Sequence, residues 1–177
     1  MDRERRTSIL ARMSYADVAE RLGLTCGFKV GGLHVVIDGS LDGVVVHQSR
    51  YGHILITRGA IAPAIGHGIE IARTGLVERL GSLFGAPRQR TGDAAFDDHI
   101  TVHSRGEPET AQLLTPALKK YLLELHATGV DFTLADDHAE VRRGVYFPAD
   151  EADAVIEGDL RVAVSLVRLV EEGRARR

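Results

Sequence analysis

The strongest candidate for a catalytic or metal-binding site in this sequence is the stretch TGDAAFDDHITVHS, residues 91–104. Three aspartates and two histidines fall between Asp93 and His103. Carboxylates and imidazoles bind zinc, manganese and iron, and the same groups act as general acids and bases. The stretch therefore presents three alternatives: a metal centre, an acid/base site, or a turn that leads into a strand.

A metal centre here would take its ligands from Asp97, Asp98, His99 and His103. If residues 99–103 form a strand, His99 and His103 face the same side but lie about 13 Å apart, which is too far for one ion. The sequence also has no HExxH motif and no His-x-His pair in this stretch. The spacing therefore predicts no bound metal, and we expect no other cofactor. An acid/base hydrolase, the second alternative, would use Asp93, Asp97, His99 and His103.

Other catalytic patterns are missing from the sequence. It contains no GxSxG elbow, and neither a P-loop nor a GxGxxG motif follows a predicted strand. The single cysteine, Cys26, excludes an internal disulfide and is expected to be a small, buried apolar residue. Arg88, Arg90 and Gly92 could hold an anion, although an ordinary solvated loop is the simpler interpretation.

The amino-acid composition argues against some classes of binding partner. The 177 residues carry a formal net charge of −3, with 5% aromatic residues and no tryptophan, which argues against a nucleic-acid partner. No apolar run approaches the roughly 18 residues that cross a bilayer, so membrane insertion is not expected. The N-terminus has no secretory signal pattern, and the expected location is therefore cytoplasmic.

The first half of the chain predicts a helix followed by strands. Apolar residues from Tyr15 to Leu22 share one helical face, and Gly23 suits the position after the helix. Short β-branched runs separated by Gly and Asp then predict an antiparallel meander. Its strands would be residues 33–37, 44–48, 53–58 and 67–73, with a weak strand at 24–30 before them and a short amphipathic helix at 75–85 after them.

The second half predicts the order β-α-β-β-α. A strand at 100–104 precedes two helices, which begin near Pro108 and Thr115. A hairpin follows, at 130–136 and 139–147, and then a helix capped by Asp150. We therefore expect an α+β fold in which helices pack on a largely antiparallel sheet. Residues 1–13 would form a flexible or helical arm, and 14–177 a single domain with possible halves at 14–90 and 91–177.

Several motifs resemble those of a diffuse group of uncharacterised bacterial α+β domains. They are LGL (22–24), GSLDGVVV (39–46), TGDAAFDDHITV (91–102), LLTPALKKYLLEL (113–125) and the helix at 150–172. The resemblance spans about residues 16 to 172. The group has no established activity, so it transfers no function to this chain. It implies that Gly92, Asp93, Phe96 and Asp97 serve the fold, as a turn, an anchoring aromatic and carboxylates that bind backbone N–H groups.

Each of these motifs is explained more simply by a structural role than by a catalytic one. We therefore expect a non-catalytic cytoplasmic module that binds a protein partner or self-associates. The exposed edges of valine-rich strands are compatible with that role. One alternative is the metal-dependent or acid/base hydrolase described above. Another is a small-ligand or lipid-binding domain, which would need an apolar cavity between the sheet and the C-terminal helix.

Overall fold

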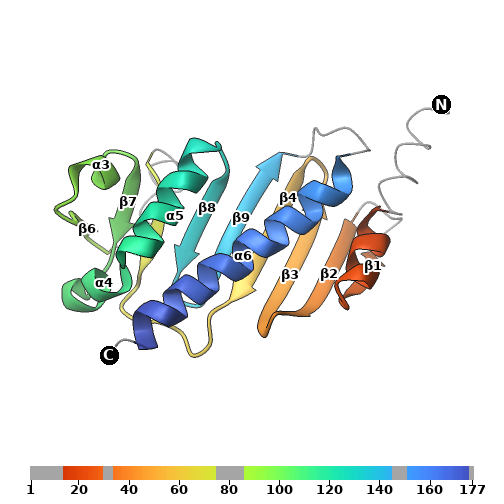
Figure 1. The fold of residues 1–177 in the computed structure, drawn as a ribbon, viewed down its shortest axis with the longest axis horizontal. Helices are drawn as coiled ribbons and strands as arrows, with labels where there is room; N and C mark the ends of the chain where they lie inside the picture. Colours follow the sequence, from red (N-terminus) through yellow and green to blue (C-terminus); the bar gives the residue numbers. More distant parts are fainter. Residues whose placement is uncertain (1–13, 30–33, 75–85, 145–150, 176–177) are drawn as a thin grey trace.

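A computed structural model describes residues 14–29, 34–74, 86–144 and 151–175. These residues form one nine-stranded sheet in which the paired strands run antiparallel, with helices packed on it (Figure 1). The predicted α+β class is confirmed. The strands are β1 (Thr25–Lys29), β2 (His34–Leu41), β3 (Val44–Tyr51), β4 (Ile54–Ala60), β5 (Glu70–Arg73), β6 (Arg88–Gln89), β7 (Ile100–His103), β8 (Asp131–Ala135) and β9 (His138–Gly144). The helices are α3 (Ala94–Asp97), α4 (Glu107–Leu113), α5 (Pro116–Ala127) and α6 (Ala152–Ala175), and residues 14–21 are also helical.

The N-terminal meander follows from its turn residues. Asp42 and Gly43, between β2 and β3, both have positive φ angles, of 52° and 85°. This is the backbone that a two-residue hairpin loop needs, and Asp-Gly adopts it readily. The turn aligns Leu41 with Val44 and extends the pairing to His34 and Tyr51. The strands predicted at 33–37, 44–48 and 53–58 correspond to β2, β3 and β4, with residue 33 outside the described residues.

The meander does not continue from β4 into β5, and this part of the prediction is wrong. The order of the sheet is β1-β2-β3-β4-β9-β8-β5-β7-β6, so the C-terminal hairpin lies between the two strands. The loop after β4 crosses the β8–β9 turn, where the Ile61 and Ile65 amides donate to the carbonyls of Asp137 and Asp136. The runs of β-branched residues indicated which segments are strands. The neighbours of each strand in the sheet, however, depend on these long-range contacts.

Helix α6 crosses one face of the sheet and contacts β3, β4 and β9 (Figure 1). Five apolar residues of α6, spaced three or four apart, are fully buried: Ile156, Leu160, Ala163, Val167 and Val170. Gly59 of β4 allows the close approach, because a Cβ atom there would lie 3.0 Å from Val167 Cγ2 and 3.1 Å from the carbonyl oxygen of Ala163. The core is therefore closely packed at this crossing.

Two short elements were not predicted, α3 and β6. Each is too short to show a hydrophobic period, so its formation depends on the loop around it. The arm expected at 1–13 and the helix expected at 75–85 lie outside the described residues. The described part of the chain contains no helix that is both long and apolar enough to span a membrane.

Candidate functional site

The aspartates of the 91–104 stretch hold a turn of backbone. Asp93 caps α3, and its Oδ1 accepts a hydrogen bond from the Phe96 amide at 3.2 Å. Asp97 accepts from both the amide and the hydroxyl of Thr91, at 3.0 and 2.9 Å. Phe96 is completely buried between them, and Gly92 has a φ angle of 79°. Both carboxylates therefore have partners within the turn.

The two histidines of this stretch have different neighbours. His99 stacks on His126 of α5, with ring centroids 4.6 Å apart. His103 places its Nδ1 3.0 Å from the carbonyl oxygen of Ala86. Asp98 is exposed. The structure thus brings Asp93 and Asp97 together around one turn but gathers neither His99 nor His103 with them, and no group of three or more potential metal ligands occurs among the described residues.

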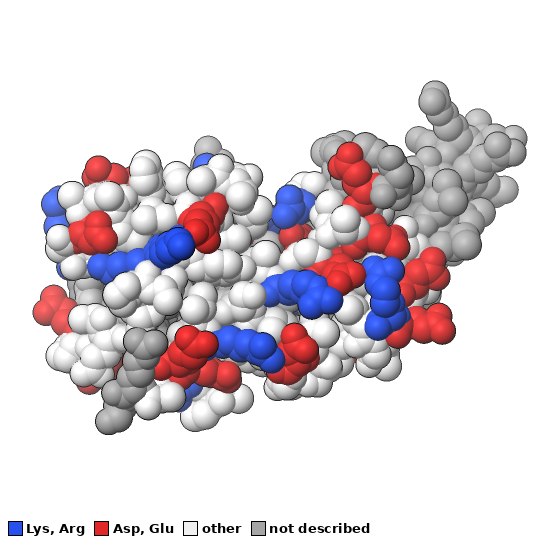
Figure 2. Space-filling model, viewed as in Figure 1, with Lys and Arg blue, Asp and Glu red and all other residues white. Residues whose placement is uncertain are grey.

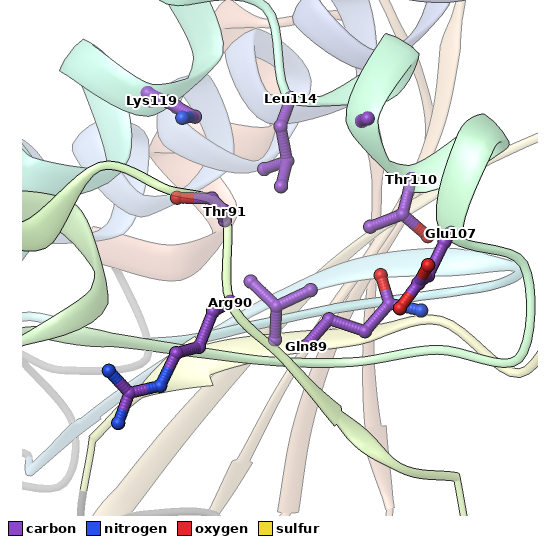
Figure 3. A pocket seen from close by; sticks show the side chains of 9 residues that line it. Gln89, Arg90, Thr91, Glu107, Thr110, Leu114 and Lys119 are labelled. Carbon is purple, nitrogen blue, oxygen red and sulfur yellow. The ribbon is translucent and has the colours of Figure 1, made fainter.

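A hollow of about 270 Å³ lies beside this turn, between β6 and helices α4 and α5 (Figure 3). Gln89 and Thr110, two of the polar side chains that line it, already have partners. Gln89 donates to the carbonyl of Ser104, the Thr110 hydroxyl donates to the Gly106 carbonyl, and the Thr110 and Ser104 hydroxyl oxygens lie 2.7 Å apart. Figure 3 shows that Arg90 extends away from Glu107. The hollow therefore offers few polar groups that converge on a ligand.

The helix-covered side carries mixed charges. Figure 2 shows basic and acidic side chains interspersed over α5 and α6, without a large area of one sign. Several of these charges form local pairs, such as Arg161 with Glu157 and Lys120 with Glu124. This pattern is typical of a solvated helical surface.

The opposite side of the sheet is defined by strand alternation, because successive side chains point to opposite faces. Gly59 contacts α6, and Gln48 and Arg143 bond to it, so their sequence neighbours face the other way. We call this the open face, since the described helices pack on the other side. Its residues include His34, Val45, His47, Tyr51, Ile54, Arg58, Glu70, Thr133, Glu140 and Arg142.

A buried carboxylate between two arginines occupies the centre of the open face. Glu140 of β9 is only 2% exposed, although it lies on the face away from the helices. Arg58, its direct cross-strand partner on β4, donates Nε–H to Glu140 Oε2 at 2.5 Å. Arg142, two residues along the same strand, donates Nε–H to Oε1. Burial of an ionised carboxylate requires such pairing, and the two guanidinium groups provide it.

The same face continues toward β2 as a row of polar groups with apolar neighbours. His47 pairs with Arg58 across the strands, and its Nδ1 lies 2.5 Å from Asp38 Oδ1. At the end of the strands, Tyr51 lies opposite Ile54 and packs against His34, with the two rings tilted and their centroids 4.2 Å apart. Tyr51 and Ile54 remain 55% and 49% exposed. The open face therefore combines ion pairs with exposed apolar side chains.

A pocket of about 560 Å³ lies between the arginine pair and β5. We call it the open-face pocket. It is lined by Arg58, Gly68, Ile69, Glu70, Thr133, Ala135, Asp136, Asp137, His138, Glu140 and Arg142. The small side chains of Thr133 and Ala135 stand on β8, between the longer ones on β9 and β5. Its volume is within the usual range for small-molecule sites.

Most acids at the rim of this pocket are already bonded. Asp136 accepts the amides of Gly68 and Ile69, each at 2.9 Å. Asp137 lies 2.6 Å from His138 Nδ1, and the hydrogen bond from this histidine holds the pKa of Asp137 below its ordinary value. Glu70 is half-buried, and its carboxylate has no hydrogen bond or ion pair with another described residue.

The sequence did not single out Arg58, Glu140, Arg142 or Glu70. The usable signal was the charged run Glu140-Val141-Arg142-Arg143 inside a predicted strand, where alternation puts Glu140 and Arg142 on one face. Arg58 joins them only because β4 pairs with β9 across more than eighty residues of chain. Such a pairing has no local signature in the sequence.

Comparisons with known proteins identify a similar fold but assign the chain to no family. No protein family model matches the chain, and no curated protein sequence matches it. The crystal structure of the mycobacterial trehalose monomycolate transport factor A, TtfA, is similar, with a TM-score of 0.64 and 10% sequence identity. The match covers 90% of this chain and 94% of that chain. At this identity the similarity shows the fold, and the resemblance to bacterial domains with a TGD-x-x-FD turn stays a prediction.

Proposed function

We propose that this chain is a non-catalytic binding domain that holds a protein partner on the open face of its sheet. The observation that carries the proposal is the composition of that face. Exposed Tyr51 and Ile54 lie beside a row of ion pairs centred on Glu140. Exposed aromatic and aliphatic side chains next to arginine are typical of protein interfaces.

The arrangement of the 91–104 stretch favours binding over hydrolysis. Asp93 and Asp97 bond to the turn itself, and His99 lies against His126. A hydrolase at this place would need an acid or base free to reach a substrate. The similar fold of a protein named as a transport factor also supports a role in binding.

The lipid-binding alternative needs an apolar cavity between the sheet and α6. Gly59 lies close against Ala163 and Val167, and Leu160 is fully buried, which opposes a cavity at this crossing. We therefore place the binding surface on the other side of the sheet. Either a second copy of the chain or another protein satisfies the proposal.

The proposal can be tested by changing the two exposed apolar residues together, as Tyr51→Asp and Ile54→Asp. Proteins that copurify with the tagged chain from its own cells would be quantified by mass spectrometry, and self-association would be measured by sedimentation velocity. We expect one specific partner, or the self-associated form, to be lost from this variant by about tenfold or more, since central apolar contacts dominate interface affinity.

A matched control changes the other side of the molecule. Glu171→Lys alters an exposed residue of α6 and should leave the partner bound. The thermal unfolding of both variants would show that each is folded. Equal recovery of all partners by the wild type and the double variant would contradict the proposal.

A further inference from the structure

We infer that the open-face pocket binds a small zwitterion, a molecule with a carboxylate at one end and an ammonium group at the other. This goes beyond the proposed protein partner, because it concerns a ligand that fits within the pocket. The inference depends on the opposite charges of the two pocket walls and on the groups in each wall that have no partner among the described residues.

The wall on β4 and β9 offers guanidinium groups to a carboxylate. Arg58 and Arg142 both bond to Glu140 through Nε, and their Nη atoms form no hydrogen bond with another described residue. A guanidinium with its Nε engaged still presents two Nη groups, which match the two oxygens of a carboxylate. The side chains of Arg58 and Arg142 are 49% and 38% exposed, so they can be reached from the pocket.

The opposite wall offers a carboxylate to an ammonium group. Glu70 lines the pocket from β5 and its carboxylate lacks a partner within the described chain, whereas the carboxylates of Asp136 and Asp137 are bonded. β8 lies between β9 and β5, so the walls stand two strand spacings, or about 10 Å, apart. Long side chains from both walls reduce this gap. A ligand that spans it therefore carries its two charges a few ångströms apart.

The charges of the pocket oppose a simple anion. Glu70, Asp136, Asp137 and Glu140 outnumber the two arginines, so an added carboxylate or phosphate alone meets net negative charge. A simple cation is attracted by this net negative charge and can pair with Glu70, but it leaves the Nη groups of the two arginines without an acceptor. A zwitterion places each of its charges against the opposite one, and it leaves the net charge of the pocket unchanged.

The test uses three probes with the same carbon chain: γ-aminobutyrate, butyrate and butylamine. Backbone amide shifts of the ¹⁵N-labelled full chain would be followed by NMR during titration with each probe, and ε-aminocaproate would test a wider charge separation. We expect a saturable shift at Gly68, Ile69 and Thr133 with a zwitterion. Butyrate and butylamine should bind at least about tenfold more weakly, since each loses one charge-assisted contact.

Two variants assign the contacts to the two walls. Glu70→Gln should weaken binding of the zwitterion about tenfold and remove its advantage over butyrate. Arg142→Gln should weaken the zwitterion similarly. Because Arg142 also holds Glu140, Glu70→Gln keeps the test decisive if the arginine variant fails to fold. Glu171→Gln on α6 is the control that should leave binding unchanged.

Three results would overturn the inference. They are no saturable shift with either zwitterion, binding of butyrate as tight as that of γ-aminobutyrate, and unchanged binding in Glu70→Gln. None of them bears on the protein partner, because these titrations contain only the purified chain and the probe.

Discussion

Arg143 of β9 and Asp159 of α6 form a bidentate ion pair that joins the sheet to its longest helix. Arg143 Nη2 lies 2.8 Å from Asp159 Oδ1, and Nε lies 3.1 Å from the same oxygen. Asp159 is 1% exposed, and its burial raises the pKa of the carboxyl, an effect that the bonded Arg143 opposes. On the other face, Arg142 points into the open-face pocket, so two consecutive arginines serve opposite sides of the sheet.

Asp159→Asn should destabilise the protein, because Arg143 would lose its charged partner beside the core. Loss of one member of a buried pair costs about 3–5 kcal/mol, but Arg143 is 36% exposed and can regain water, so we expect about 2–3 kcal/mol. Urea unfolding followed by circular dichroism would measure the change. The control Glu124→Gln breaks an exposed pair with Lys120 and should cost less than about 0.5 kcal/mol. Equal effects from the two variants would contradict this assignment.

Gly59→Ala should loosen α6 from the sheet. The new methyl group would lie within 3.1 Å of Ala163 and Val167, and overpacking of this kind costs about 1–3 kcal/mol. Gly27→Ala is the matched control, because no atom beyond its two chain neighbours lies within 4 Å of the position its methyl group would take. Thermal unfolding of the two variants would compare them. A Gly59→Ala protein as stable as the wild type would show that the helix is not held this closely.

Asp97→Ala should destabilise the turn even though it leaves no gap in the core. The variant deprives Thr91 of the acceptor for its amide and hydroxyl, which should cost about 1–3 kcal/mol. Asp98→Ala, at an exposed position next in sequence, should change the stability by less than about 0.5 kcal/mol. Chemical unfolding would distinguish the two. A stable Asp97→Ala protein would favour a role other than support of the fold.

His126 should make stability depend on pH below neutrality. Burial, followed by the charges of Arg73 and His99, lowers its pKa from the ordinary 6.5. The unfolded chain therefore takes up the proton first, and stability is lost as the pH falls from about 6.5 through the pKa of the folded state. NMR titration of the ring should show a pKa nearer 6.5 in His99→Gln than in the wild type. A wild-type pKa above 6.5 would contradict the expected sign.

The elements of this fold were largely predictable, but their neighbours were not. Asp42-Gly43 determined a hairpin, and Thr115-Pro116 determined the start of α5, because such signals act within a few residues. The place of β5 beside β8 depended on contacts between distant segments. Local chemistry therefore identified the strands, while their order required the folded chain.

The candidate site was less predictable than the fold. The 91–104 stretch resembles a site because its polar residues are close in sequence, but the structure places Asp93 and Asp97 in a hydrogen-bonded turn. Arg58, Glu70 and Glu140 are far apart in sequence and meet only on the open face. Close spacing along the chain reveals a site when all of its residues lie on one helix, strand or loop. Here the residues of the site lie on several strands.

The most direct measurement for the central claim is site-specific photo-crosslinking from the two sides of the sheet in living cells. A photoreactive phenylalanine would replace Tyr51 on the open face or Glu171 on α6, both of which are exposed. If the open face holds the partner, position 51 should give one dominant crosslinked protein, or a crosslinked dimer, that position 171 does not give. Crosslinks of equal yield and identity from both positions, or from position 171 alone, would contradict the account.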